Sequence, residues 1–406
     1  MALNDPELTP LVWRTVALYS AANFGANALA AFGNAALPLY LASYGAPNVA
    51  IGFLAQERSF IGGLAQPLVG ALSDRTRSPL GRRRPFFLVG VPLVVLSLLA
   101  LAAHPPFWSA VALLAVLAFF LAVAYDPYLA LLADIVPSQQ RGRVGGAMGV
   151  ANMTGQVALL AAASLLWEER EGLVFGLVAV AVAAGFATTF LGIREPPNPN
   201  QPGPPVRPSL RPLAYIRGVL AERELAKYVC VTGLFWLGTG GVVPFLTRYG
   251  VDELRVETST AFQLLLVAVA TTALFALPAG ALGDRFGKQR VLGLGLLGYG
   301  AACLAGAAAQ TVAQAFVILA AVGVANAACT VLLFPLLADL LPRDRAGELT
   351  GLGSAVWSIS QPLGAAGAGL LADLTGSLRT ALFLAGLLTL ASAALLTRVR
   401  SPKSEV

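Results

Sequence analysis

Charged residues are scarce in this chain of 406 residues, of which Asp, Glu, Lys and Arg make up only 12%. An ordinary soluble domain carries about a quarter charged residues. Hydrophobic residues make up 57% of the sequence, and the mean hydropathy is +0.74. The composition therefore excludes a typical water-soluble domain and predicts a protein that is embedded in a lipid bilayer.

Histidine and cysteine are almost absent, because the chain has one histidine, His104, and three cysteines. All three cysteines, Cys230, Cys303 and Cys329, fall in apolar segments, so no disulfide framework is implied. The sequence contains no Cys/His ligand cluster, no paired-Asp metal motif and no Gly-x-Ser-x-Gly nucleophile elbow. We therefore expect neither an enzyme nor a protein with a bound metal or cofactor.

Long apolar runs dominate the remaining sequence. A bilayer is crossed by about 20 residues of helix, and barrel strands are alternating segments of only about 10 residues. Continuous runs of this length predict helices, since lipid offers the backbone no hydrogen-bonding partner. We predict an all-α integral membrane protein with twelve transmembrane helices, at about 15–42, 49–73, 86–103, 107–133, 144–167, 172–193, 225–247, 258–282, 291–309, 313–341, 348–372 and 377–397.

The sequence also repeats itself. The stretch "GALSDRTRSPLGRRRPF" at 70–86 is echoed by "GALGDRFGKQRV" at 280–291. Likewise "LLADIVPSQQRGRVGGAMGVANMTGQ" at 131–156 is echoed by "LLADLLPRDRAGELTGLGSAVWSISQ" at 336–361, so that equivalent residues lie 205 positions apart. Two pseudo-symmetric six-helix halves are predicted.

A proline-rich segment separates the two halves. Residues 194–212 contain eight prolines in nineteen positions, a composition that cannot be helical and is typical of a semi-rigid linker. We place the N-terminal half at 1–193, the linker at 194–224 and the C-terminal half at 225–406.

Lys and Arg residues predict the orientation in the membrane. If the N-terminus is cytoplasmic, the inner segments hold 22 of the 27 basic residues, as the positive-inside rule requires. Both termini are therefore expected in the cytoplasm, in a protein of the inner or plasma membrane. Nucleic acid is a poor partner, because the basic residues are divided among membrane loops.

Two six-helix halves joined by a cytoplasmic linker resemble the major facilitator superfamily. Its signature loop between the second and third helices has a Gly, then Asp-Arg, then Gly with basic residues, and this chain carries the pattern twice. The resemblance implies a cytoplasmic gating motif that latches the two halves and whose glycines permit close helix approach. The alternative is that these arginines only obey the positive-inside bias. The candidate gating residues are Gly70, Asp74, Arg75, Gly81, Arg82, Arg83, Asp134, Arg141, Asp284, Arg285 and Asp339.

A narrower resemblance is carried by "GLAQPLVGALSDRTRSPLGRRRPF" and "DPYLALLADIVPSQQRGR", within residues 60–142. These stretches are similar to the glycoside–pentoside–hexuronide branch, and within it to the sucrose-transporter-like proteins. The implied function is sugar–proton symport. The sodium-coupled members of that branch carry two aspartates in the second helix, where this chain has Gly62 and Gln66, so no sodium site is expected. The Pro-x-Arg of the sucrose-transporter-like proteins is replaced by Pro127-Tyr128-Leu129.

Two acidic residues within apolar segments are candidates for proton coupling, since charge in the membrane is costly. Asp126 lies eight residues before Asp134, or about 12 Å along a helix, near the middle of a hydrocarbon core of about 30 Å. A buried carboxyl can bind and release a proton as water access alternates. Glu57, beside Arg58, is expected near the outer boundary. The alternatives are an Asp126 satisfied by Tyr or backbone groups, and a Glu57 that anchors the chain at the interface.

Amides and tryptophans within the apolar segments are candidates for binding a neutral sugar. Amides bond hydroxyl groups, and an aromatic ring stacks on the C–H face of a sugar. The alternative is that the amides hold neighbouring helices together. The candidate substrate-binding residues are Asn27, Asn152, Gln156, Trp236, Asn326, Trp357 and Gln361.

The sequence therefore predicts a secondary active transporter that takes up a disaccharide or glucoside with protons by alternating access. Its partners are a small-molecule substrate, protons and membrane lipid, and we expect a monomer. A proton-coupled exporter of drugs or metabolites on the same fold is the alternative, although its cavity should hold fewer amides. A non-transporting receptor would not need a titratable group in mid-membrane.

Overall fold

The computed structural model describes residues 13–136, 140–193, 221–340 and 346–399, which form helices and connecting turns with no strand among them. Its first half contains α1 (Trp13–Ala31), the π-helix η1 (Phe32–Ala36), α2 (Leu37–Ser43), α3 (Asn48–Ala55), α4 (Glu57–Arg75), α5 (Pro85–Leu101), α6 (Phe107–Ile135) and α7 (Arg141–Gly192). Its second half contains α9 (Arg223–Val242), the 3-10 helix η3 (Val243–Phe245), α10 (Leu246–Asp252), α11 (Thr258–Phe286), α12 (Lys288–Ala308), α13 (Val312–Leu340), α14 (Ala346–Thr375) and α15 (Arg379–Leu396).

These helices make up the twelve membrane spans that the sequence predicted. Seven helices in the described ranges are long and apolar enough to cross a bilayer on their own. One of them, α7, supplies two spans, because the backbone of Arg170 leaves the helical region (φ −146°, ψ 55°) and turns the chain back. The remaining four spans are the broken series α1–η1–α2, the pair α3–α4, the short helix α5, and α14.

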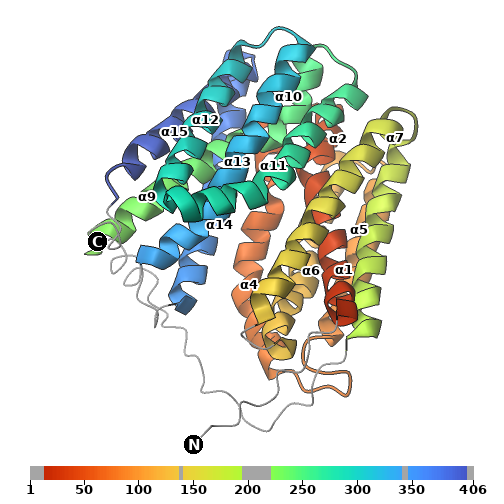
Figure 1. Cartoon of the computed structure of the whole chain (residues 1–406). Helices are drawn as coiled ribbons and strands as arrows, with labels where there is room; N and C mark the ends of the chain where they lie inside the picture. Colours follow the sequence, from red (N-terminus) through yellow and green to blue (C-terminus); the bar gives the residue numbers. More distant parts are fainter. Residues whose placement is uncertain (1–12, 137–139, 194–220, 341–345, 400–406) are drawn as a thin grey trace, which may run out of the picture.

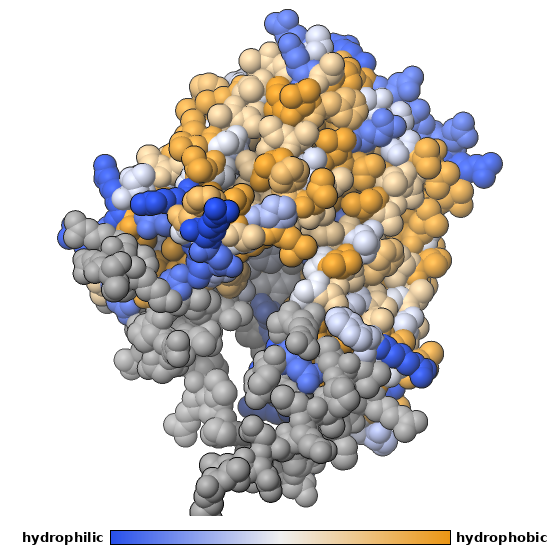
Figure 2. Space-filling model, viewed as in Figure 1, coloured by the Kyte–Doolittle hydropathy of each residue, from blue (hydrophilic) through white to orange (hydrophobic). Residues whose placement is uncertain are grey.

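The two ends of the bundle differ in chemistry. We call the end that carries Arg82, Arg83 and Lys288 the basic end; it is the lower end in Figure 1. The opposite end holds the turns at His104, Arg170 and the start of α15. Between the two ends large apolar side chains face outward over the surface seen in Figure 2. This exposed apolar surface is what a protein surrounded by lipid requires.

Small residues let the spans pack with their backbones in contact. Helix α1 lies along both arms of α7, where a Cβ added to Gly25 would collide with the backbone of Ala181, and one added to Gly185 with that of Ala21. In the second half α9 packs in the same way on α14, where a Cβ on Gly364 would overlap the Leu237 carbonyl. Such small-residue contacts are the usual basis of close helix packing in membranes.

Buried hydroxyl groups reinforce these glycine contacts. The rings of Tyr19 in α1 and Tyr128 in α6 stack with centroids 4.6 Å apart. Each hydroxyl donates to the other residue's backbone carbonyl, over 2.7 Å from Tyr19 and 3.0 Å from Tyr128. This reciprocal pair fixes the register between the two helices without leaving a polar group unsatisfied in the apolar interior.

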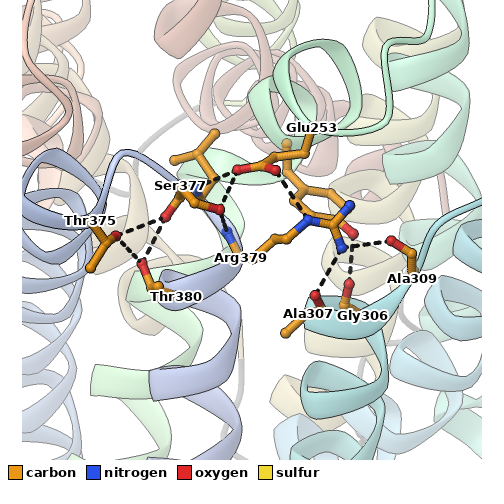
Figure 3. Close-up of polar contacts among 10 residues, drawn as sticks. Glu253, Gly306, Ala307, Ala309, Thr375, Ser377, Arg379 and Thr380 are labelled. Atoms are coloured by element: carbon orange, nitrogen blue, oxygen red, sulfur yellow. Dashed lines mark hydrogen bonds and ion pairs between the residues drawn. The ribbon is translucent and has the colours of Figure 1, made fainter.

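Glu253 and Arg379 organise the opposite end of the second half (Figure 3). One oxygen of Glu253 accepts from the Ser377 hydroxyl (2.6 Å) and the other from Arg379 Nε (3.1 Å). The Arg379 guanidinium also donates to the carbonyls of Ala307 and Ala309. Burial alone would raise the pKa of Glu253, but the hydrogen bonds from its partners lower it below its ordinary value. The cluster ties the end of α10 and the start of α15 to the end of α12.

The predicted linker, 194–224, lies almost entirely outside the described residues, and the boundaries of the two halves stay a prediction. The described chain resumes at 221, and α9 begins at Arg223.

The glycine contacts lead to a stability prediction at Gly155 of α7, where an added Cβ would collide with the Phe24 carbonyl of α1. We expect Gly155→Ala to destabilise the protein by roughly 1–3 kcal/mol, as overpacking of a close contact does. Thermal unfolding in detergent, followed by tryptophan fluorescence, measures the change as a lower Tm. The matched control is Gly149→Ala on the same helix, whose Cβ would meet no atom within 4 Å. An equal effect of the two substitutions would contradict the packing explanation.

Candidate functional site

A cavity of about 610 Å³ lies between the two halves of the bundle. Most of its lining comes from α1, η1, α6 and α7 of the first half and from α9, α11, α13 and α14 of the second half. All seven candidate substrate-binding residues lie on its wall: Asn27, Asn152, Gln156, Trp236, Asn326, Trp357 and Gln361. The structure thus brings together side chains that the sequence separates by up to 334 positions, although their contact with a substrate stays a prediction.

Amides in the wall of the first half bond to one another. Gln156 Nε2 donates to Asn152 Oδ1 over 2.5 Å, within one turn of α7. Asn27 Nδ2 donates to the backbone oxygen of Asn23 over 2.8 Å, and the Tyr125 hydroxyl donates to Asn23 Oδ1 over 2.9 Å. The Tyr125 contact joins α6 to α1, and Asn23 Nδ2 donates to the Met148 carbonyl of α7 over 2.7 Å, so that Asn23 holds the three helices together as interhelical amides do. Because an amide has two donor hydrogens and a carbonyl, the residues that line the cavity retain capacity for a ligand.

Aromatic rings characterise the wall of the second half. Trp236 of α9 and Trp357 of α14 meet edge to face, with centroids 6.3 Å apart and planes inclined by 70°. Gln361 lies one turn beyond Trp357, is 9% exposed and abuts α9 at Gly240. Asn326 reaches Thr272 across the gap between α13 and α11. The two walls therefore offer different chemistry, with amides on one side and indole rings beside amides on the other.

The sequence analysis missed several polar wall residues, among them Gln56, Tyr125, Thr239, Thr272 and Tyr299. Gln56 stands where the second span breaks between α3 and α4, and its amide donates to Asn34 Oδ1 over 3.2 Å. Tyr125 precedes Asp126 and could have been found from that neighbour, because the two occupy the same turn. Nothing in the local sequence marks the break at Gln56.

Every described residue that lines the cavity is uncharged. Asp126, the first candidate for proton coupling, is half-buried in α6, which runs without a break through Pro127. It is not part of the described wall, whereas the preceding Tyr125 is. Glu57 is the first residue of α4, and its side chain lies outside the described part of the structure. Proton coupling by either residue stays a prediction.

The candidate gating residues at the basic end form ion pairs around Arg83, whose side chain is only 8% exposed. Its guanidinium contacts Asp74 (2.7 Å), Asp134 (3.2 Å) and the Ser73 hydroxyl (2.6 Å). Arg82 also pairs with Asp134, at 2.8 Å. These contacts join the loop between α4 and α5 to the ends of α4 and α6.

The second copy of the motif is simpler. Lys288 pairs with Asp339 over 2.8 Å. Asp284 is exposed and makes no ion pair with a described residue, and the Arg285 guanidinium lies 5.2 Å from the centroid of the Phe286 ring.

Two further candidates lie at the basic end. Arg75 is exposed, and Arg141 Nε donates to the Val136 carbonyl. All the basic-end ion pairs described above lie within one half, so a latch between the halves stays a prediction.

The motif glycines differ in their surroundings. A Cβ added to Gly70 would meet no described atom within 4 Å in this conformation, and close helix approach at this position stays a prediction. Gly81 and Gly287, which precede the basic residues Arg82 and Lys288, instead have φ of +105° and +96°. Glycine adopts this conformation without the strain that a Cβ would cause, so these two glycines are required to turn the chain.

The opposite end is closed by contacts that do cross between the halves. The Asp373 carboxylate of α14 accepts hydrogen bonds from the backbone N–H groups of Asn48 (2.8 Å) and Val49 (2.9 Å) at the start of α3. Arg248 of α10 donates to the Asn48 side chain. The Thr247 hydroxyl donates to the Ala35 carbonyl of η1 over 2.8 Å.

In contrast, Figure 2 shows the molecule hollowed between its two lobes toward the basic end. The cavity is therefore sealed at the opposite end in this conformation.

Known proteins with similar sequences are transporters. Multidrug resistance protein MdtG of Serratia proteamaculans (strain 568) is 28% identical over 271 residues, 63% of this chain and 62% of that protein. Its namesake in Salmonella typhimurium (strain LT2) is 29% identical over 283 residues, 64% of each. The matched region thus spans just under two thirds of the length of these curated relatives.

Solved structures share the fold over nearly the whole chain. The nucleoside transporter NupG superposes with a TM-score of 0.77 at 11% identity, covering 96% of this chain and 99% of that chain. A bacterial homolog of the human lysosomal transporter Spinster, in an inward-facing and occupied conformation, gives 0.73 at 15% identity, with 98% and 97% covered. At these identities the likeness shows the fold alone.

The family assignment comes from the sequence itself. A model of the family described as MFS/sugar transport protein matches residues 18–388, which include every described residue that lines the cavity. With its twelve spans and central cavity, the chain belongs to this family of the major facilitator superfamily, and it is a membrane transporter.

Proposed function

We propose that the protein is a proton-coupled symporter of neutral glycosides the size of a disaccharide, working by alternating access. The observation that carries the proposal is that the described residues of the cavity wall are all uncharged, with amides on both walls and a tryptophan pair on one. A charged substrate would be desolvated there without a counter-charge, at a cost of several kcal/mol. Sugar hydroxyls are suited to Asn and Gln, which offer both donors and acceptors.

The size and aromatic content of the cavity support the same substrate class. Its volume of about 610 Å³ lies within the usual range for small-molecule sites. Trp236 and Trp357 present ring surface to the C–H face of a pyranose, beside the Gln361 amide. The Gln156 and Gln361 amides occupy equivalent positions in the two halves, so a bound sugar would be held from both sides as the halves move.

Asp126 is the proposed proton carrier. It lies in α6 next to a cavity residue, Tyr125, so that a change in its charge acts on the cavity wall through the same helical turn. Protonation of Asp126 would favour the sugar-bound protein, because burying a neutral carboxylic acid in an apolar interior costs less free energy than burying a carboxylate. In this proposal the basic end faces the cytoplasm, both termini are cytoplasmic, and the monomer is the working unit.

Export of an apolar compound is the second candidate function. The curated relatives are multidrug resistance proteins, and leucines and valines make up much of the remaining cavity wall. A wall of leucine and valine side chains is compatible with a flat aromatic substrate stacked on Trp357. The remaining donors and acceptors of the wall amides would then find no partner on the substrate, and for this reason we place export second.

The proposed function predicts that sugar carries protons into vesicles. We expect proteoliposomes with an internal pH dye to acidify when sucrose, maltose or trehalose is added outside, with no response to a cationic drug. Empty liposomes and glucose serve as controls for leak and for monosaccharide transport. Proton release triggered by the drug, with no response to any sugar, would instead establish the exporter.

A second prediction concerns Asp126. We expect Asp126→Asn to abolish sugar accumulation driven by a pH gradient, while sugar exchange at equal concentrations on both sides continues, because the amide cannot carry a proton. Radiolabelled uptake and counterflow in the same vesicles separate the two activities. Glu169→Gln, which neutralises an exposed carboxylate at the opposite end, should accumulate sugar normally. Undiminished accumulation by Asp126→Asn would remove Asp126 from the mechanism.

A third prediction concerns the aromatic wall. Replacing Trp357 by Leu removes a ring that lines the cavity and should raise the KM for sugar about tenfold, equivalent to 1.4 kcal/mol. Trp108→Leu is the matched control, because Trp108 is 78% exposed on the outside of the bundle and should leave the KM unchanged. Initial rates of uptake over a range of sugar concentrations give both values. If the two variants behaved alike, sugar stacking on Trp357 would be refuted.

A further inference from the structure

Two spans of the first half are interrupted beside the cavity. The first changes from α-helix to π-helix over η1 (Phe32–Ala36), and the second breaks at Gln56, whose backbone (φ −109°, ψ 14°) ends α3 and starts α4. Single π-turns inside longer helices are rare and occur frequently at functional sites. Both interruptions line the cavity, through Asn34 and through Gln56.

The chain between the two interruptions forms a separate unit, which we call the gate hairpin, residues 37–55. It consists of α2, a turn at Gly45 with φ +72°, and α3. The first N–H groups of α3 are bonded to Asp373 of the other half, 325 positions away in the sequence. A Cβ added to Gly52 would collide with the Ala365 backbone, so α3 and α14 are also in close contact. The hairpin is thus the part of the first half that closes the opposite end.

One side-chain hydrogen bond joins the two interruptions. Gln56 Nε2 donates to Asn34 Oδ1 over 3.2 Å, and the Gln56 side chain is almost completely enclosed, at 4% exposed. The remaining amide atoms, Asn34 Nδ2 and Gln56 Oε1, make no hydrogen bond to a residue in the described ranges. Two amides that lie at the hinges of the hairpin and also line the cavity are in a position to respond to a ligand.

We infer that the Asn34–Gln56 pair is the contact through which an occupied cavity controls the gate hairpin. This inference rests on the proposed function, because the ligand must carry hydroxyl groups. A sugar hydroxyl accepts the hydrogen bond of Gln56 Nε2 and replaces Asn34 as its partner. The two interruptions are then no longer tied together, and the hairpin separates from Asp373 so that the opposite end opens. Gln56 is therefore a positioning residue that acts on the gate through Asn34.

A purely structural amide pair would behave differently. Amides that hold membrane helices together stabilise the packing whether or not a ligand is bound. In the inferred role, the position of the gate hairpin depends on both the amide pair and the ligand. Measuring the distance between the hairpin and the other half therefore separates the two explanations.

The experiment measures the gate distance directly. Nitroxide labels are attached to cysteines introduced at Ser43, on the exposed side of the hairpin, and at Leu374, which is 76% exposed in the other half. The three native cysteines are replaced by alanine, and the distance distribution is recorded by pulsed electron resonance in lipid nanodiscs, with and without sucrose, maltose or trehalose. Quenching of tryptophan fluorescence in the same samples reports sugar binding.

In the parent protein we expect one short distance without sugar and an additional longer distance with it. Gln56→Leu should raise the ratio of long to short distance about fivefold without sugar, as the loss of one buried hydrogen bond does. Asn34→Leu should have the same effect, and the double variant should add nothing further, because both substitutions remove one contact. The matched control is Gln263→Leu, an exposed glutamine of α11 outside the cavity wall, which should resemble the parent.

Two results would overturn the inference. One is a Gln56→Leu distribution equal to that of Gln263→Leu in the absence of sugar. The other is sugar that binds the parent protein without changing the distance, in which case the proposed function stands and the gate control fails. If none of the three sugars binds, both the proposed function and the inferred control of the hairpin by a ligand are wrong. The comparison of Gln56→Leu with Gln263→Leu in the absence of sugar still decides whether the Asn34–Gln56 pair holds the gate hairpin in place.

Discussion

The hydrocarbon core of a bilayer contains no water to satisfy a polar group, so each one must bond within the protein or face a water-filled space. The amides and hydroxyls of this chain divide accordingly. Tyr19 and Tyr128 satisfy each other's backbone carbonyls deep between α1 and α6. Asn152, Gln156 and Gln361 have only partial partners and are placed around the cavity instead. The position of the candidate site follows from this division, because the polar side chains that helix packing does not use are collected in one place.

The packing that encloses the cavity is tighter at one end than at the other. At the opposite end backbones touch at Gly52 and Gly369, and Asp373 bonds the first turn of α3. Near the middle of the same interface, a Cβ added to Gly63 would reach Ser358 only at an ordinary contact distance of 3.6 Å. The ion pairs around Arg83 and Lys288 lie within their own halves. The two ends therefore differ in the interactions that the structure shows, which are backbone contacts between the halves at one end and ion pairs within each half at the other.

The twelve spans were predictable because an apolar run of twenty residues has few structural solutions in lipid. The wall of the cavity could be inferred in part, since Gln156 and Gln361 occur at equivalent positions of a repeated sequence and repeated halves face each other across the cavity. The break at Gln56 was not predictable, because a π-turn or a change of helix direction depends on packing from other spans. The ion pairs were not predictable either. The two signature loops look alike in sequence, yet the longer first loop lets Arg82 and Arg83 both reach Asp134, while in the second Asp284 makes no ion pair with a described residue.

Helix α5 has a consequence for the surrounding lipid. Its 17 residues span about 25 Å, less than the roughly 30 Å of a typical hydrocarbon core. Both ends are fixed in place, the first by the Arg84 guanidinium over the Phe190 ring (4.3 Å) and the last by the Tyr40 hydroxyl on the Leu101 carbonyl (2.8 Å). Because the helix cannot lengthen, the mismatch on this flank of the protein is met by a locally thinner bilayer or by flanking residues that snorkel to the interface. The length of the lipid acyl chains, which sets the thickness of the host membrane, therefore determines how large this mismatch is beside the first half.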